Sequence, residues 1–179
     1  ESGDSAEAVA TVRRLTVMSQ ENVPARQLLV RLLTAAGQTH AAVEEQLALV
    51  GVLRQLGSAS EAIEAAREAV AMSGGSVRAR RMLADSLLAA GNTDAANNEL
   101  EELAKLHIEA GQFTDALGVL DEIIERSPER TSSRILRAEV YAKLGEAEKA
   151  LDEYRAISAA VTSGAAAAPA APVAPATCA

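Results

Sequence analysis

Seven of the eleven glycines divide the chain at regular intervals. They are Gly3, Gly37, Gly57, Gly91, Gly111, Gly145 and Gly164. The intervals are 34, 20, 34, 20, 34 and 19 residues, so the pattern repeats after 34 + 20 = 54 residues. When 3–56, 57–110 and 111–163 are aligned, alanine recurs at 8, 62 and 116 and arginine at 26, 80 and 134. The chain therefore contains three copies of one design.

Within each copy the apolar residues recur at steps of three and four, as in Ile63, Ala66 and Val70. This is the period of an amphipathic helix, and no segment alternates as a strand would. We expect nine helices, near 5–18, 24–36, 39–56, 59–72, 77–90, 93–110, 113–126, 131–144 and 147–161.

The expected helix ends carry their own signals. Glycine follows Ala36, Ala90 and Leu144, where a left-handed residue commonly ends a helix. The pairs Ser58 with Glu61 and Asp4 with Glu7 have the spacing of a capping box.

The 20-residue interval has room for one helix only, whereas a 34-residue interval holds a pair. Thr39–Leu56 is then the second helix of the pair that starts before Gly37 and the first helix of the pair that follows. One helix serves two neighbours, so each 54-residue unit has three helices instead of four.

The chain resembles the tetratricopeptide repeat family, whose 34-residue unit is a helix–turn–helix with small residues at positions 8 and 20. In the window 97–130 the matching residues are Leu103, Ala104, Gly111, Ala116, Leu120 and Pro128. In the window 131–163 they are Ala138, Tyr141, Gly145, Ala150 and Tyr154. Departures are the missing aromatic residue at position 4 and Arg137 at an apolar position. The resemblance implies an all-α, right-handed helical-repeat solenoid of about nine antiparallel helices in three 54-residue units.

Two sets of polar residues are candidates for binding a partner. By resemblance, the groove positions of the first helices fall at Arg78, Arg81, Asp85, Arg31, Glu139 and Lys143. Because the fused helix changes which helices line the inner face, these residues could equally form a solvated surface with pairs such as Arg81 with Asp85.

The second set is the arginine row, Arg26, Arg80 and Arg134, which points the same way once per unit. It could bind an acidic peptide. Alternatively its methylene stems cover apolar surface while the guanidinium groups pair with acids on the adjacent helix.

Composition and motifs argue against other functions. The net charge of −8 disfavours nucleic acid as the main partner. No run is long enough to insert in a membrane, and no phosphate-binding loop or metal-ligand cluster is present in the sequence. No carboxylate cluster at ligand spacing flanks His40, so we do not expect it to bind a metal. We expect His107 to be a buried packing residue and Cys178 to be a thiol without a function. We expect no enzyme activity and no cofactor.

We expect a repeat domain over 1–163 and an Ala/Pro-rich flexible tail or linker over 164–179. The absence of a signal peptide slightly favours the cytoplasm, although a chain that starts at Glu1 leaves the localisation open. The Ala- and Arg-rich usage is typical of bacterial sequences.

The resemblance and the lack of catalytic motifs predict a non-catalytic module that binds a protein or peptide, such as a scaffold in a multiprotein assembly. The alternative is a regulatory or sensor segment of a larger signalling or transcription protein. The first helix lacks an obvious polar cap, because its apolar residues Val9, Val12, Leu15 and Met18 follow directly on Gly3. This predicts either end-to-end self-association or further helical repeats upstream.

Overall fold

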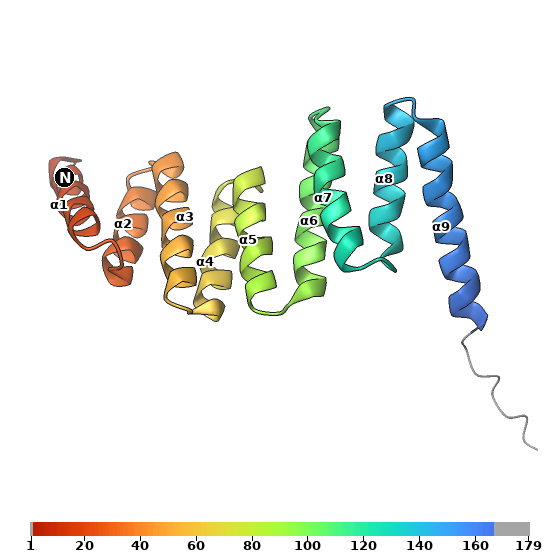
Figure 1. Cartoon of the computed structure of the whole chain (residues 1–179). Helices are drawn as coiled ribbons and strands as arrows, with labels where there is room; N and C mark the ends of the chain where they lie inside the picture. Colours follow the sequence, from red (N-terminus) through yellow and green to blue (C-terminus); the bar gives the residue numbers. More distant parts are fainter. Residues whose placement is uncertain (1, 167–179) are drawn as a thin grey trace, which may run out of the picture. The chain divides into compact units, whose positions relative to one another are not determined.

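The computed structural model describes the backbone of residues 2–166 and the side chains of residues 6–162. This part of the chain contains nine helices and no strand (Figure 1). They are α1 (Ser2–Met18), α2 (Val23–Ala35), α3 (Thr39–Gln55), α4 (Ala59–Met72), α5 (Val77–Ala89), α6 (Thr93–Glu109), α7 (Phe113–Arg126), α8 (Thr131–Lys143) and α9 (Ala147–Ala166). The chain also falls into two compact parts, which are not the 54-residue repeats. We call them the first unit, which holds α1 to α6, and the second unit, which holds α7 to α9. The predicted all-α helical-repeat fold is confirmed.

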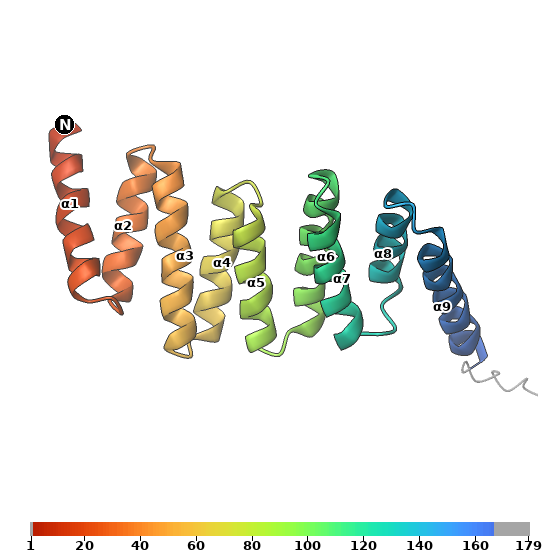
Figure 2. The same cartoon turned by 45° about the horizontal axis from the view of Figure 1, so that its top comes forward.

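The fused helix is present in both places where the glycine spacing predicts it. Each of α3 and α6 is one continuous helix of 17 residues. In the first unit α3 lies between α2 and α4 and contacts both (Figure 2). It also contacts α5. Because both sides of α3 are covered, its buried residues lie around most of its circumference: Ala42, Gln46, Leu47, Leu49, Val50, Val52 and Leu53.

Small side chains bring the helices of each pair together. Ala42, Ala62 and Ala96 are completely buried, and Ala150 is 6% exposed. An alanine at such a position lets the facing helix approach closely, while leucines beside it fill the remaining space. Leu29 and Leu33 of α2 do this against Val9 and Val12 of α1, in a core cluster that Ala42 also joins.

The helix ends agree with the glycine pattern but not with the predicted capping boxes. Gly37, Gly57 and Gly91 have φ of 70°, 74° and 77°, the left-handed conformation expected after a helix. Ser58 precedes α4 but its side chain makes no capping hydrogen bond. Asp4 lies inside α1, which starts at Ser2, so it cannot be the residue before that helix.

The side-chain caps that do form belong to other residues. Asn22 Oδ1 accepts from the backbone N–H of Ala25 at 3.0 Å, and Ser76 Oγ accepts from that of Ala79 at 3.2 Å. Both stand at the start of the helix after α1 or α4, one 54-residue step apart. These caps fix the entry of α2 and α5.

Near the end of the chain the structure differs from two further expectations. Helix α9 runs to Ala166 and passes through Gly164, where the sequence predicts the start of a tail. Tyr154, which the repeat pattern assigns to packing, is 51% exposed. The rest of the predicted tail, with Cys178, lies outside the described residues.

The continuity of α3 and α6 predicts how proline substitutions behave. Ala48 and Glu102 are exposed residues in the middle of these helices, so proline there acts mainly through the backbone. Proline removes a hydrogen bond and clashes with the preceding turn, and we expect Ala48→Pro and Glu102→Pro each to lower the free energy of unfolding by about 3 kcal/mol or more. Gly57→Ala should cost about 1 kcal/mol, because only the helix end is disturbed. Urea melts measure all three.

A matched control is available in α5. Arg78→Pro recreates after Val77 the Val23–Pro24 sequence with which α2 begins. The N–H of this position has no partner within a helix, so Arg78→Pro should melt close to the parent chain. Mid-helix proline variants that melted like this control would show that α3 and α6 are not continuous.

Candidate functional site

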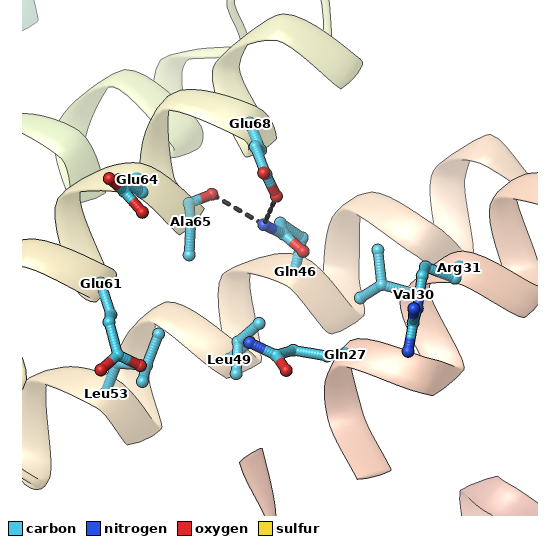
Figure 3. Close-up of a pocket in the computed structure, with 10 residues that line it drawn as sticks. All are labelled: Gln27, Val30, Arg31, Gln46, Leu49, Leu53, Glu61, Glu64, Ala65 and Glu68. Atoms are coloured by element: carbon cyan, nitrogen blue, oxygen red, sulfur yellow. Dashed lines mark hydrogen bonds between the residues drawn. The ribbon is translucent and has the colours of Figure 1, made fainter. Parts of the chain in front are cut away.

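A groove opens between α2 and α4, with α3 as its floor. We call it the α2–α4 groove; its volume is about 360 Å³. Its lining is Gln27, Val30, Arg31, Gln46, Leu49, Leu53, Glu61, Glu64, Ala65 and Glu68 (Figure 3). All ten residues belong to the first unit, so three consecutive helices of one body build the whole site.

The floor of the groove is apolar. Leu49 and Leu53 of α3 are 3% and 2% exposed, and Val30 of α2 is 8% exposed. Leu49 and Leu53 belong to a core cluster that also holds Ala62 and Ala65 of α4. Side chains held in a packed core present a rigid apolar surface to anything that enters the groove.

One wall of the groove is acidic. Glu61, Glu64 and Glu68 follow one another along α4 at steps of three and four, which places them on one face of that helix. Glu61 and Glu64 make no ion pair or side-chain hydrogen bond with any residue that the structure describes. The wall thus presents carboxylates without a cation to balance them.

Gln46 links the floor to this wall. Its side chain is 2% exposed, and its Nε2 donates to the carbonyl oxygen of Ala65 at 3.0 Å and to Glu68 Oε2 at 2.8 Å (Figure 3). A buried amide needs such partners, since an unsatisfied polar group inside a protein is costly. The two bonds hold α3 against α4 and fix the position of the Glu68 carboxylate.

The opposite wall comes from α2 and carries Gln27 and Arg31. Arg31 is exposed and forms no ion pair with a described residue. It also borders a second hollow of about 530 Å³ that shares Val30 and Glu68 with the groove and continues to Met72. The two hollows adjoin at these shared residues, and we call them together the depression along α2 and α4.

The other groove candidates from the sequence lie elsewhere. Arg78 of α5 pairs with Glu44 of α3, and both side chains are exposed. Asp85 lies between Arg81, at 3.0 Å, and Arg54, at 3.9 Å. These residues tie α5 to α3, so of this set in the first unit only Arg31 lines the groove.

In the second unit, Glu139 and Lys143 form an i,i+4 pair on α8 at 3.6 Å. The Arg81–Asp85 and Glu139–Lys143 pairs are those expected for a solvated helix face. A role for either pair in binding stays a prediction.

Each member of the arginine row pairs with a glutamate of the following helix. Arg26 binds Glu45, Arg80 binds Glu99 at 2.9 Å, and Arg134 binds Glu153 at 3.1 Å. The three glutamates are themselves 54 residues apart, so the whole pair repeats. Arg26 Nε also donates to the carbonyl oxygen of Gln20, and Arg134 Nε to that of Pro128, both at 3.0 Å. Arg26 and Arg134 thus fasten their own helix to the preceding loop and to the next helix, whereas Arg80 joins α5 to α6.

The second unit adds a further arginine to this pair. Arg137 of α8 binds Asp121 of α7 and Glu153 of α9, and stands where the other copies have the buried leucines Leu29 and Leu83. Burial disfavours the charged guanidinium, but the hydrogen bonds and charges of Asp121 and Glu153 outweigh it and raise the pKa of Arg137. Arg137 therefore stays charged and joins three helices.

Sequence reasoning missed most of the groove. Its acidic wall is visible in the sequence only as glutamates at a helical spacing, a pattern shared by many solvated helices. Gln46 carries no signal at all, because the corresponding residues of the other copies are Leu100 and Tyr154.

Other candidates for chemistry find no support among the described residues. Within residues 6–162 no group of three or more His, Asp or Glu side chains could hold a metal ion. His40 is exposed at the start of α3, and His107 is half-buried on α6. In the described part, no helix has the length and apolar character that crossing a membrane requires.

The repeated pair predicts an order of stability effects. The Glu153 side chain is 10% exposed and serves two arginines, whereas Glu99 is 26% exposed and serves Arg80. Glu153→Gln leaves Arg134 without its charged partner and Arg137 with Asp121 alone, and should lower the free energy of unfolding by about 2–3 kcal/mol. Glu99→Gln should cost about 1 kcal/mol or less. Urea melts compare both with Glu125→Gln, an exposed control; equal costs for all three would contradict the assignment.

Comparison with known proteins supports the repeat architecture. Two tetratricopeptide repeat models match the sequence, over residues 101–175 and 53–107. No curated protein matches along its sequence.

Several solved structures are similar to the chain. A MamA crystal structure is 15% identical, covers 96% of this chain and 100% of its own, and has a TM-score of 0.43. YrrB, described as a TPR protein with an unusual peptide-binding site, is 14% identical over 83% of this chain and 91% of its own, with a TM-score of 0.34. A putative kinesin light chain of Podosopora anserina with nearly identical TPR-like repeats is 17% identical over 90% and 96%, with a TM-score of 0.40.

The repeat models, the glycine pattern and the paired helices lead to one conclusion. The chain belongs to the tetratricopeptide repeat family, whose fold is generally a non-catalytic one for protein interaction.

Proposed function

We propose that this chain is a non-catalytic interaction module, of the kind that serves as a scaffold in a multiprotein assembly, and that the α2–α4 groove holds its peptide partner. The partner segment carries a lysine or arginine beside apolar side chains. The observation that supports this proposal is the combination of an acidic wall with a rigid apolar floor in one groove.

The charges of the groove favour a basic segment. Glu61, Glu64 and Glu68 face a single cation, Arg31, so the lining has an excess of two negative charges (three acids minus one base). A lysine or arginine entering between the walls forms charge-assisted hydrogen bonds with carboxylates that have no cation of their own. An acidic segment would meet repulsion from the same wall.

The apolar floor adds a second requirement. Leu49, Leu53 and Val30 stand at the base of the groove and Met72 at its continuation. An apolar side chain of the partner would cover this surface and gain about 25 cal/mol for each Å² removed from water. Specificity then follows from two features together, a cation for the wall and an apolar side chain for the floor.

The length of the depression suits a short segment. From Glu61 to Met72 is eleven residues along α4, or about 16 Å at 1.5 Å per residue. An extended peptide advances about 3.3 Å per residue, so about five residues of the partner lie in the groove. Such a short contact can be part of a larger interface on the same module.

The proposal can be tested with fluorescence anisotropy and three labelled ten-residue peptides. The first peptide alternates lysine and leucine, the second has glutamate for lysine, and the third has serine for leucine. We expect the first to bind and the other two to bind at least about tenfold more weakly, which corresponds to about 1.4 kcal/mol. Binding of the first should weaken as salt is added.

Variants locate the binding surface. Glu61→Gln with Glu64→Gln should weaken binding of the lysine–leucine peptide about tenfold or more. Glu125→Gln with Glu129→Gln removes two exposed acids from the second unit and should leave binding unchanged. Equal loss in both double variants would mean that the peptide responds to net charge alone, and the groove would lose its assignment.

A further inference from the structure

Helices α1 and α9 each have one neighbour among the described helices, whereas α3 has a helix on both sides. Helix α1 contacts α2, and α9 contacts α8. Each therefore has a face on which no described helix packs. The internal repeat shows what kind of surface belongs on these faces, because α9 corresponds to α3 and α1 corresponds to α4.

The free face of α9 carries an apolar stripe. Leu151, Tyr154 and Val161 are 48%, 51% and 62% exposed, and Ser158 between them is exposed as well. The steps of three, four and three residues place all four side chains on one side of the helix. We call them the α9 stripe.

Three of the four corresponding residues of α3 are buried, and Val43 is half-buried. Two 54-residue steps earlier stand Val43, Gln46, Val50 and Leu53. Gln46, Val50 and Leu53 are 2%, 0% and 2% exposed, and they pack on α4. The α9 stripe thus has the register of a helix–helix interface that the same chain already makes once.

The free face of α1 carries the other half of this interface. We call Ala8, Thr11, Leu15 and Met18 the α1 stripe; Leu15 is 48% and Met18 84% exposed. One 54-residue step later, α4 has Ala62, Ala65, Ala69 and Met72 at these positions. The three alanines are 0%, 6% and 0% exposed, because α3 covers them.

We propose that a second copy of this chain fills the gap: the α9 stripe of one copy packs on the α1 stripe of the next, as α3 packs on α4 within the chain. The correspondence extends to a polar pair at the edge. Gln46 of α3 donates to Glu68 of α4. In the repeat alignment Gln46 corresponds to Tyr154 of α9, and Glu68 corresponds to Arg14 of α1. A guanidinium donates to a phenol oxygen or stacks on its ring, so this pair is compatible as well.

The contact joins two different surfaces and is therefore heterologous. Such a contact leaves one free α1 stripe and one free α9 stripe in every dimer, so association continues into rings or open chains. Arg155 stands at the border of the α9 stripe, where α3 has Leu47, and is paired with Asp152. Its long stem can cover apolar surface while the charge stays in water. Neither stripe belongs to the α2–α4 groove, so this proposal does not rest on the peptide site.

Sedimentation velocity over a concentration series to about 1 mM tests the contact, since an interface of one helix pair is small and weak. We expect the parent chain to form species larger than a dimer as its concentration rises. Tyr154→Arg places a second cation opposite Arg14 and should weaken association at least about tenfold. Ala159→Arg adds the same charge to an exposed α9 residue outside the stripe and should leave association unchanged.

Mixing separates this contact from a symmetric one. Tyr154→Arg blocks the α9 stripe, and Leu15→Arg blocks the α1 stripe, while each variant keeps its other stripe. Each should be monomeric alone, and an equimolar mixture should form one-to-one dimers and nothing larger. In the double variant Tyr154→Arg with Arg14→Glu, the opposite charges should restore association.

Circular dichroism melts confirm that each variant is folded. A parent chain that stays monomeric to about 1 mM overturns the proposal. So does a mixture of the two blocked variants that stays monomeric, or association of the parent that Tyr154→Arg and Ala159→Arg weaken equally.

Discussion

The structure of the first unit depends on α3 being one unbroken helix that packs on both sides. A surface helix usually buries one stripe, whereas α3 buries residues around most of its circumference. Helix α3 is the second helix of the pair α2–α3 and the first helix of the pair α3–α4. Two separate pairs would need a further turn and parts of two helices, which this chain lacks. Helix α6, one 54-residue step later, is likewise one unbroken helix of 17 residues. Because α3 is shared, α2 and α4 become its two flanks, and the groove between them follows directly.

Two devices hold this arrangement, and both repeat with the unit. Alanines at completely buried positions let neighbouring helices approach, and the arginine row pairs α2, α5 and α8 with a glutamate of the next helix. Arg26 and Arg134 also bind the loop before their helix. In the second unit Arg137 replaces a core leucine, and Asp121 and Glu153 compensate its charge. The repeated polar pairs set the register of adjacent helices without using Glu61 or Glu64 of α4, which have no ion-pair partner among the described residues, while Glu68 is held by Gln46.

The fold was largely predictable because periodic apolar residues and glycines with positive φ mark helices locally. Helix α4 and helix α7 have the predicted bounds, and both fused helices are present. The predicted start of α1 and the predicted end of α9 differ from the structure, since neither point carries a distinct sequence signal. The prediction that Ser58 caps α4 was wrong, because residue spacing alone does not orient a hydroxyl group. Of the residues that line the groove, the sequence predicted only Arg31. The others could not be predicted, because the face of α4 that is turned toward α2 depends on how α3 packs between them. The glutamates that bind the arginine row could have been found by extending the same repeat search to acidic residues.

Amide hydrogen exchange along α3 tests the fused helix most directly. An ordinary pair of repeats would place a turn near Ala48, where backbone amides exchange quickly, whereas a continuous helix hydrogen-bonds each of them. We expect the amides of residues 45–51 to be protected as strongly as those in the middle of α4. Fast exchange confined to residues 45–51, with protected amides on either side, would contradict the shared helix and with it the three-helix unit and the groove.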